Sequence, residues 1–291
     1  MVQRNRTIVA VGYFDGVHIG HRELFRKAKE IADRTGYRPI AITFDFSTAQ
    51  RPSGKGASDL YQREESFRIM RELGVEPEII RFEDIADLSP NEFIHGILIS
   101  GYDAEYILSS KDFRFGRGRS AGVSELKELC AAYGIRSVTV EEELYGGRPV
   151  STARIKELVA NGDVATAGKM LGEPYHFSSV VAKGKGLDRQ IGCPTINQVF
   201  PNILRPARGV YASVAEVDGI EYHSVTDIGI RPTVEVEGEY RAETHIIDLD
   251  EDLLGKEIRV YLLRRLRDEK KFSSVDELVK AIHMDIQEAL K

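Results

Sequence analysis

The pattern of apolar residues changes about halfway along this chain of 291 residues. In the first half, short apolar runs such as residues 7–12 and 39–44 alternate with stretches whose apolar residues recur every three or four positions, the spacing of a helix with one buried face. In the second half, strand-like runs follow one another with only short turns between them. The first pattern predicts a parallel, doubly wound sheet, and the second predicts an antiparallel sheet or small barrel.

We therefore predict an α/β domain in residues 1–172 and an all-β domain in residues 173–291. The first is expected to be Rossmann-like, with a doubly wound parallel sheet, and to end in linking helices within residues 151–171. The second is expected to be a small antiparallel β-barrel with a terminal amphipathic helix over residues 274–290. The strands expected in the second domain cover residues 177–181, 209–217, 221–228, 240–247 and 257–263.

Composition narrows the class of protein further. With 42% hydrophobic residues the chain can bury a core, and its 2 cysteines are too few and too far apart for a disulfide framework or a cysteine-based zinc site. The net charge of -6 disfavours a general nucleic-acid binder. No apolar run approaches the ~20 residues of a membrane helix, and the first residues lack the apolar region of a signal peptide. We expect a cytoplasmic enzyme that binds neither nucleic acid nor membrane, and the sequence predicts no particular oligomeric state.

Residues 12–21, Gly-Tyr-Phe-Asp-Gly-Val-His-Ile-Gly-His, follow a predicted strand and precede a predicted helix. In a doubly wound sheet this position lies at the carboxyl ends of the strands, where ligands bind. Glycines allow a tight turn, and the start of a helix attracts phosphate. His18 and His21 add donors that can meet charge developing on a phosphoryl group. A turn with incidental histidines is the alternative, but the combined pattern favours a phosphate site.

A second group of polar residues lies in the all-β half. Residues 192–197, Gly-Cys-Pro-Thr-Ile-Asn, are expected in a loop, where Thr195 and Asn197 point the same way if the backbone is extended. A hydroxyl and an amide oxygen suit Mg²⁺, which keeps phosphate and water as its other ligands. Glu243, on a predicted strand, has the chemistry to orient or deprotonate an attacking hydroxyl, although a solvated strand glutamate is the alternative. His245 shares its strand face, but that spacing alone assigns it no role.

These motifs resemble those of the bacterial bifunctional riboflavin kinase/FAD synthetase family. The His-x-Gly-His run and its Phe-Asp-Gly-Val-His extension resemble the family's nucleotidyltransferase-type domain, and residues 111–117 are similar to its Asp/Asn-Phe-x-Phe-Gly segment. The segments that resemble the family's riboflavin kinase domain are residues 192–197, 209–211, 229–233, 243–248 and 267–272.

The resemblance implies that the all-β half phosphorylates riboflavin to FMN and that the α/β half adenylylates FMN to FAD, with ATP and Mg²⁺ in both steps. It implies that Glu243 is the base for the ribityl hydroxyl and that His18 and His21 are catalytic in the other half. Thr195 and Asn197 would hold Mg²⁺ and ATP phosphate, and Arg267 and Phe272 would cover the flavin. The remaining residues implied in ATP and phosphate binding are Gly12, Phe14, Asp15, Gly16, Asp112, Ser151, Thr152 and Lys156.

The chain departs from the family pattern at several positions. Phe46-Ser47-Thr48 stands where the family has Pro-His-Pro, and Ser110 stands where it has glycine. The family's Ser-Ser-Thr-x-x-Arg contains Ala153 and Lys156 here, and Asp227 replaces an asparagine of the second half. Two alternatives therefore stay open: a riboflavin kinase with a disabled or altered adenylyltransferase domain, and a flavin-binding regulator without catalysis.

Overall fold

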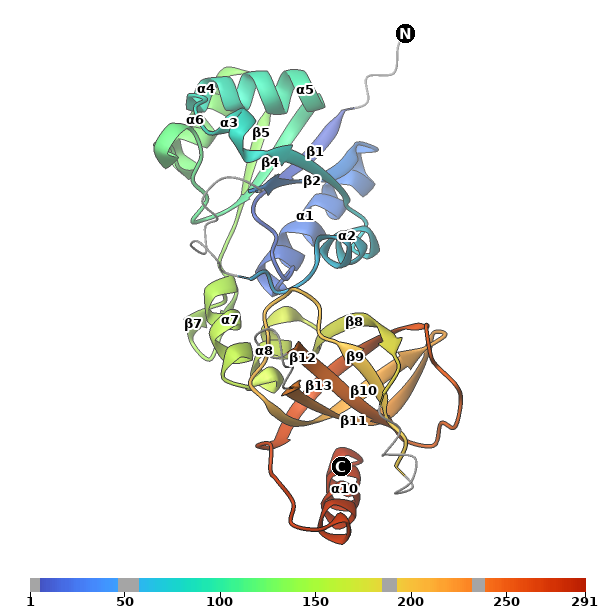
Figure 1. The fold of residues 1–291 in the computed structure, drawn as a ribbon. Helices are drawn as coiled ribbons and strands as arrows, with labels where there is room; N and C mark the ends of the chain where they lie inside the picture. Colours follow the sequence, from blue (N-terminus) through green and yellow to red (C-terminus); the bar gives the residue numbers. More distant parts are fainter. Residues whose placement is uncertain (1–5, 47–57, 185–192, 232–238) are drawn as a thin grey trace. The chain divides into compact units, whose positions relative to one another are not determined.

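The computed structural model describes residues 6–46, 58–184, 193–231 and 239–291. The chain divides into two compact units, Met1–Thr152 and Ala153–Lys291, which we call the α/β unit and the barrel unit (Figure 1). Helices α7 (Thr152–Ala160) and α8 (Val164–Leu171) lie mainly in the second of these. The domain boundary between residues 172 and 173 stays a prediction.

The α/β unit contains a five-stranded parallel sheet with the strand order β3-β2-β1-β4-β5. The order reverses between β1 and β4, so the loop after β1 opens at the switch point where such sheets bind ligands. The predicted doubly wound parallel sheet is confirmed. Its strands are β1 (Thr7–Val11), β2 (Arg38–Asp45), β3 (Glu76–Arg81), β4 (Ala104–Ser110) and β5 (Arg136–Val140).

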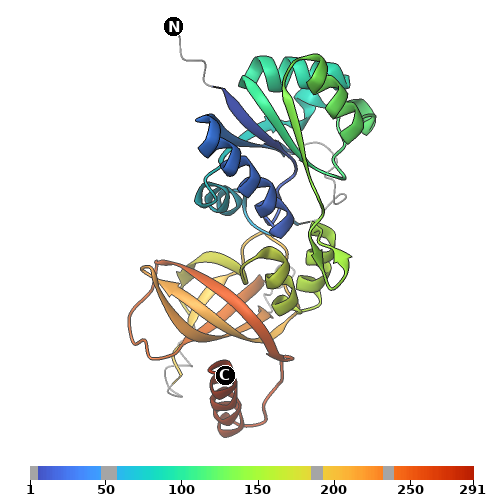
Figure 2. The same cartoon turned by 180° about the vertical axis from the view of Figure 1, so that it is seen from behind.

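Helices cover both faces of this sheet (Figures 1 and 2). On one face α1 (Ile19–Thr35) packs against β1, β2 and β4, and α2 (Arg63–Glu72) packs against β3. Alternate residues of a buried strand point to opposite faces of a sheet. On the other face Val9 and Ile40 form one apolar core with Phe93 and Leu126. The helices of that face are α3 (Phe82–Ile85), α4 (Pro90–Glu92), the π-helix Phe93–Ile99, α5 (Ser100–Tyr102) and α6 (Val123–Ala132).

Short elements complete the α/β unit. A single 3-10 turn, Arg117–Arg119, precedes α6. The strands β6 (Leu144–Tyr145) and β7 (Arg148–Pro149) form a small antiparallel pair before α7. Within the described ranges of the chain, no helix is both long enough and apolar enough to cross a bilayer.

The barrel unit is a closed, six-stranded antiparallel barrel in the order β10-β11-β12-β9-β8-β13, with β13 pairing back to β10. Helix α10 (Val275–Ala289) follows the last strand, so the predicted barrel with a terminal helix is confirmed. The strands are β8 (Tyr175–Ala182), β9 (Ile196–Val199), β10 (Gly209–Val217), β11 (Ile220–Arg231), β12 (Glu239–Ile246) and β13 (Glu257–Arg267).

The expectation of a loop throughout residues 192–197 was wrong, because Ile196 and Asn197 lie on β9. This strand has only 4 residues, and it pairs both with the preceding strand β8 and with β12, from which β10 and β11 separate it along the chain. No local alternation of that length separates a strand from an extended loop, so the pairing could not be predicted from the segment alone.

The interior of the barrel is partly polar. The Ser213 hydroxyl lies 2.8 Å from the hydroxyls of Ser224 and Thr226, and the Thr226 hydroxyl lies 2.9 Å from that of Thr244. All four side chains are buried, so each hydroxyl needs a partner of this kind. Because Thr244 points inward, its neighbour Glu243 on β12 points to the outer surface of the barrel.

Candidate functional site

The first candidate site is the loop between β1 and α1. Gly16 has φ 79° and Val17 has φ 42°, both in the left-handed region that glycine tolerates and a β-branched residue does not. The Arg22 Nε donates to the Val17 carbonyl over 3.1 Å, which ties the strained turn to the first turn of α1. His18 follows as the residue that caps this helix.

His18 and His21 stack on each other beside this turn. Their ring centroids are 3.6 Å apart with an interplanar angle of 18°, and Phe14 packs edge-on against His21 at 5.1 Å. Burial lowers the pKa of His18 to about 4, although the Asp112 carboxylate partly offsets this effect. Burial and the neighbouring His18 lower the pKa of His21 well below its ordinary value, even though part of that side chain stays accessible. Both imidazoles are therefore neutral near pH 7.

One ring nitrogen of each histidine, Nδ1, is buried in a way that reduces the stability of the folded protein. Nδ1 of His18 and Nδ1 of His21 are both buried and have no hydrogen-bond partner among the described residues. A buried polar atom without a partner is destabilising by about 1–3 kcal/mol, and such atoms are rare outside functional sites. Hydrogen bonds within the described protein therefore do not account for the pair, and its role in phosphate binding stays a prediction.

Other predicted residues lie around the loop. The Asp15 carboxylate accepts a hydrogen bond from the Leu60 backbone N–H at 2.7 Å, and the Thr152 hydroxyl donates to the Asp15 carbonyl at 3.3 Å. The Ser110 hydroxyl donates to Asp112 at 2.6 Å, and Asp112 is close enough to His18 to influence its pKa. The structure therefore brings Asp15, Asp112 and Thr152 to the histidine loop.

The remaining positions of the first site are less fully placed. Gly12 follows β1, and a Cβ added there would lie 2.9 Å from the Phe14 ring. Ser151 is exposed next to Thr152, whereas Lys156 lies on α7 within the barrel unit; their roles stay predictions. Phe46 is buried and packs edge-on against Tyr13 at 5.2 Å. Residues 47, 48, 192, 232 and 233 of the predicted motifs lie outside the described residues.

The second candidate site is a row of polar residues on the outer surface of the barrel. In the strand ladder Asn197 lies directly opposite Glu243, and Glu243 lies directly opposite Asp227. Residues directly opposite each other share one face, with Cβ atoms about 5 Å apart. The amide and the two carboxylates are therefore neighbours, held by the backbone pairing of β9, β12 and β11.

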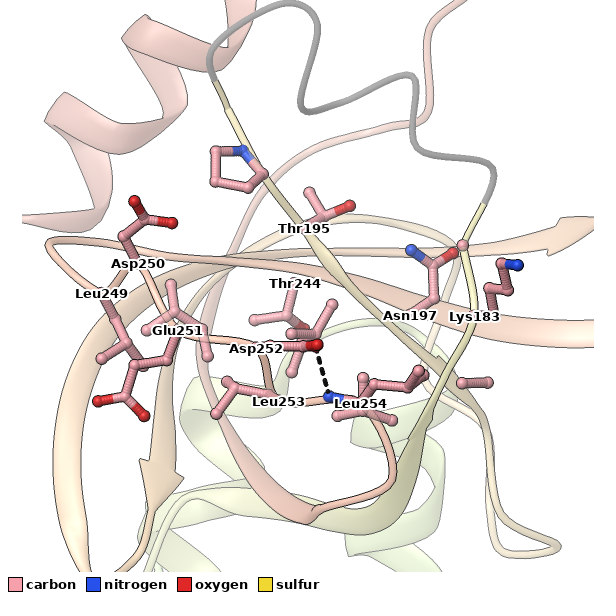
Figure 3. Close-up of a pocket in the computed structure, with 16 residues that line it drawn as sticks. Lys183, Thr195, Asn197, Thr244, Leu249, Asp250, Glu251, Asp252, Leu253 and Leu254 are labelled. Atoms are coloured by element: carbon pink, nitrogen blue, oxygen red, sulfur yellow. Dashed lines mark hydrogen bonds between the residues drawn. The ribbon is translucent and has the colours of Figure 1, made fainter.

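A cavity of about 310 Å³ opens beside this row and is lined by Thr195, Asn197 and Lys183. Figure 3 shows Lys183 and Asn197 on one side of the cavity and Asp250 and Glu251 on the other. Glu243 does not line this cavity, whereas its ladder partner Asn197 does. The structure thus brings the two predicted metal ligands into one cavity and places the predicted base next to it.

Arg267 and Phe272 lie at the other end of the same row. Asp227 is opposite Val210, and Val210 is opposite Arg267, which places Arg267 three strand spacings from Glu243, or about 14 Å along the curved surface of the barrel. The Arg267 guanidinium pairs with the Asp285 carboxylate of α10, with Nη2 and Oδ2 2.8 Å apart, and lies 5.7 Å from the Phe272 ring. The two predicted flavin residues are therefore in contact beside α10.

The pKa of Asp227, which lies between Glu243 and the Arg267 side of the barrel, is raised. Burial, reinforced by the carboxylates of Glu269 and Glu243, raises its pKa to about 6, against the opposing effect of Arg267. The side chain keeps an exposed surface, but protein and negative charge surround the rest of it. The departure from asparagine at this position thus places a titratable group beside the predicted base.

Two residues at the barrel site were not predicted to act there. Lys183 lines the cavity, and the glycine-rich basic run Lys-Gly-Lys-Gly over residues 183–186 was a signal that could have identified it. His245 lies on β12, and its Nδ1 is 2.8 Å from the carbonyl oxygen of Pro194. The sequence holds no sign of this contact, because the two residues are far apart along the chain.

The chain thus combines a parallel sheet that carries a histidine pair at its switch point with a closed barrel that carries an amide–carboxylate row, and comparison with known proteins assigns this combination to two-part transferases. The family model described as FAD synthetase matches residues 1–154, and the one described as riboflavin kinase matches residues 171–291. The chain therefore belongs to the family of bifunctional riboflavin kinase/FMN adenylyltransferases, and the resemblance seen in the sequence motifs is confirmed.

Full-length relatives support the same assignment. The bifunctional riboflavin kinase/FMN adenylyltransferase of Bacillus subtilis (strain 168) is 32% identical and aligns with 99% of this chain and 93% of its own length. The protein of the same description from Escherichia coli (strain K12) is 31% identical and covers 96% and 90%. A solved Streptococcus pneumoniae structure, whose title names a macrolide-efflux protein, has a TM-score of 0.89 at 29% identity and covers 99% and 95%. The fold is thus shared over nearly the whole chain.

Proposed function

We propose that this chain phosphorylates riboflavin to FMN in the barrel unit and adenylylates FMN to FAD in the α/β unit, with ATP as the donor in both reactions. The observation that carries the proposal is the match of two separate family models to two separate units. Each of these units has its own polar site, and the relatives of the same two-part description align over nearly their full length.

In the barrel unit, Glu243 is the group suited to take the proton of the attacking hydroxyl. It is a carboxylate on a paired strand, next to the cavity that contains Thr195 and Asn197. As the ribityl oxygen bonds to the γ-phosphorus of ATP, the bond from that phosphorus to ADP breaks and the hydroxyl proton passes to Glu243. Lys183 in the cavity supplies positive charge for the phosphates.

The donor atoms at the cavity fit Mg²⁺ that is bound mainly through phosphate. Among the described residues, no three His, Cys, Asp or Glu side chains gather to form a metal cage, and Thr195 and Asn197 offer one hydroxyl and one amide oxygen. Mg²⁺ commonly binds a few protein oxygens and completes its shell with substrate phosphate and water. Thr195 and Asn197 would hold the ion, which would neutralise charge on the transferred phosphoryl group when bound.

In the α/β unit, the neutral histidine pair suits adenylyl transfer. An oxygen of the FMN phosphate bonds to the α-phosphorus of ATP, and the bond to pyrophosphate breaks. The attacking phosphate oxygen is already ionised, so no base is required, and stabilisation of charge and alignment are the main tasks. His18 and His21 can donate ring N–H groups to phosphate oxygens without the mutual repulsion of two charged rings. Gly12, Phe14, Asp15, Gly16, Asp112, Ser151, Thr152 and Lys156 are the remaining candidates for ATP binding.

The flavin-binding role of Arg267 and Phe272 has structural support. The guanidinium is oriented by Asp285, and it approaches the aromatic ring closely enough for a cation–π contact. A planar cation beside an aromatic ring offers a surface for a flat ring system. The cytoplasmic location stays a prediction from the sequence.

The experiment incubates the purified full-length protein with ATP and Mg²⁺, first with riboflavin and then with oxidised or reduced FMN, and separates the products by chromatography. The proposal predicts FMN from riboflavin and FAD from FMN. FMN without FAD from either flavin form would indicate a kinase whose adenylyltransferase domain is disabled. Flavin binding without either product would indicate a regulator.

A further inference from the structure

The contact between His245 and Pro194 connects the two segments that form the barrel site. His245 Nδ1 lies 2.8 Å from the Pro194 carbonyl oxygen. A carbonyl oxygen can only accept a hydrogen bond, so Nδ1 must carry the hydrogen and the ring is fixed in one tautomer when neutral. Pro194 immediately precedes Thr195, and His245 follows Glu243 on the same face of β12.

This hydrogen bond lies just beyond the end of the backbone pairing between β9 and β12. The ladder between β9 and β12 runs from Val199 opposite Arg241 to Ile196 opposite Thr244. One step further along, Thr195 precedes β9 and His245 follows Thr244. The side chain of His245 therefore extends the attachment of the two segments beyond the ladder to Pro194, two residues before Ile196.

We propose that His245 is a positioning residue for phosphoryl transfer: it holds the Pro194–Thr195 segment against β12, and so fixes the Thr195 hydroxyl relative to Asn197 and Glu243. This inference rests on the proposed kinase function of the barrel. Asn197 is held by the ladder itself, whereas Thr195 lies just outside it. A hydroxyl that moves by about 1 Å can weaken a reaction of this kind by a large factor.

The matched substitutions separate positioning from packing. His245→Leu removes the donor and keeps an apolar side chain of moderate size. In His245→Asn the amide nitrogen is bonded to Cγ, as Nδ1 is in histidine, so the side chain can still donate a hydrogen bond to the Pro194 carbonyl. His223→Leu is the control, because His223 is an exposed histidine on the adjacent strand β11 and forms no part of the described row.

The kinetic test measures FMN formation by the full chain with riboflavin, ATP and Mg²⁺. For His245→Leu we expect the KM for ATP to rise about tenfold, the scale seen when a residue that orients a ligand is removed, with the riboflavin dissociation constant unchanged. His245→Asn should restore most of the ATP affinity, and His223→Leu should match the unsubstituted protein. An unchanged KM for ATP in His245→Leu, or equal loss in the leucine and asparagine variants, would overturn the proposal.

A second measurement does not depend on activity. Two-dimensional NMR of the ¹⁵N-labelled full chain reports which ring nitrogen of His245 carries the hydrogen, with His245→Asn used to assign the signal. The Nδ1–H tautomer is expected, and the Nε2–H tautomer would refute the contact even in a protein that makes FMN normally. If the unsubstituted protein formed no FMN while the Nδ1–H tautomer was present, the proposed function would have failed and the contact would stand.

Discussion

The two sites of this chain are held in place by different means. In the α/β unit the histidines sit on a turn with two consecutive left-handed residues, Gly16 and Val17, which Arg22 ties to α1. In the barrel unit Asn197 and Glu243 lie opposite each other on paired strands. The first site depends on a strained loop and on packed rings, and the second depends on backbone register.

This difference has energetic consequences. A β-branched residue at positive φ is destabilising by about 1–3 kcal/mol, and the buried nitrogens of His18 and His21 add to that cost. The barrel row carries no such strain, because a ladder position is fixed unless the whole strand shifts and all its side chains change face. We therefore expect substitutions near His18 and His21 to disturb the geometry of the α/β site, whereas comparable substitutions near Glu243 should leave the geometry of the barrel site largely intact.

The largest expected effect tests whether the barrel site acts alone. Glu243→Gln keeps the size of the side chain and removes its ability to take a proton. We expect kcat for FMN formation to fall about 1,000-fold, the typical contribution of a general base, with riboflavin binding retained. FAD formation from added FMN should not change, because the histidine site is separate from this row.

The control for this change is Glu257→Gln, another exposed strand glutamate of the barrel. It should leave both reactions intact. Normal FMN formation by Glu243→Gln would remove Glu243 from the mechanism. Loss of both products would show that the two sites are not independent.

The second largest effect is expected from a substitution at the histidine site of the α/β unit. His21→Ala removes one ring of the stacked pair, and we expect FAD formation to fall about 100-fold, the scale for the loss of one hydrogen-bond donor to a charged transition state. FMN formation should continue. His95→Ala is the matched control, because His95 is an exposed histidine of the same unit that packs on Tyr133.

Equal loss of FAD formation in His21→Ala and His95→Ala would contradict a specific role for the stacked pair. If instead His21→Ala also stopped FMN formation, the contrast between two separately held sites would no longer stand.

Sequence patterns were sufficient to predict both folds and most residues of the histidine loop. The apolar runs around residues 7–12 and 39–44 form paired parallel strands, and His18 and His21 come from one continuous motif, so their proximity follows from local chemistry. The contacts of the barrel site could not be predicted in this way. Asn197, Glu243 and Asp227 become neighbours only through the pairing of three strands, and that register is set by the closed barrel as a whole.

A third prediction concerns the response of the α/β unit to acid. The pKa values of His18 and His21 lie below the ordinary value of 6.5, so below that pH the unfolded chain takes up protons that the folded chain excludes. The free energy of unfolding therefore decreases as the pH falls below 6.5, and for His18 the decrease continues to about pH 4. His18 should account for about 2 kcal/mol of this loss between pH 6.5 and pH 5, and His21 acts in the same direction.

Urea unfolding followed by circular dichroism at pH 7 and pH 5 measures this loss. His21→Phe, which keeps an aromatic ring beside Phe14, should show a smaller loss on acidification than the unsubstituted protein. An identical loss in both proteins would show that His21 does not carry the acid sensitivity.

The smallest expected effect has the opposite sign and belongs to the barrel. The pKa of Asp227 is raised from 3.8 to about 6, so between these values the folded chain holds a proton that the unfolded chain has released. The free energy of unfolding therefore falls as the pH rises through this window. Asp227→Asn removes the cost of ionising this carboxyl in the folded protein and should stabilise the protein at pH 7.5 by less than about 1 kcal/mol, because solvent screens the exposed part of the side chain.

Urea unfolding at pH 7.5 and pH 3.5 checks the sign of this effect. The gain in the free energy of unfolding should be present at the higher pH and absent at the lower. A gain of equal size at both would mean that packing, rather than charge beside Glu243, explains it.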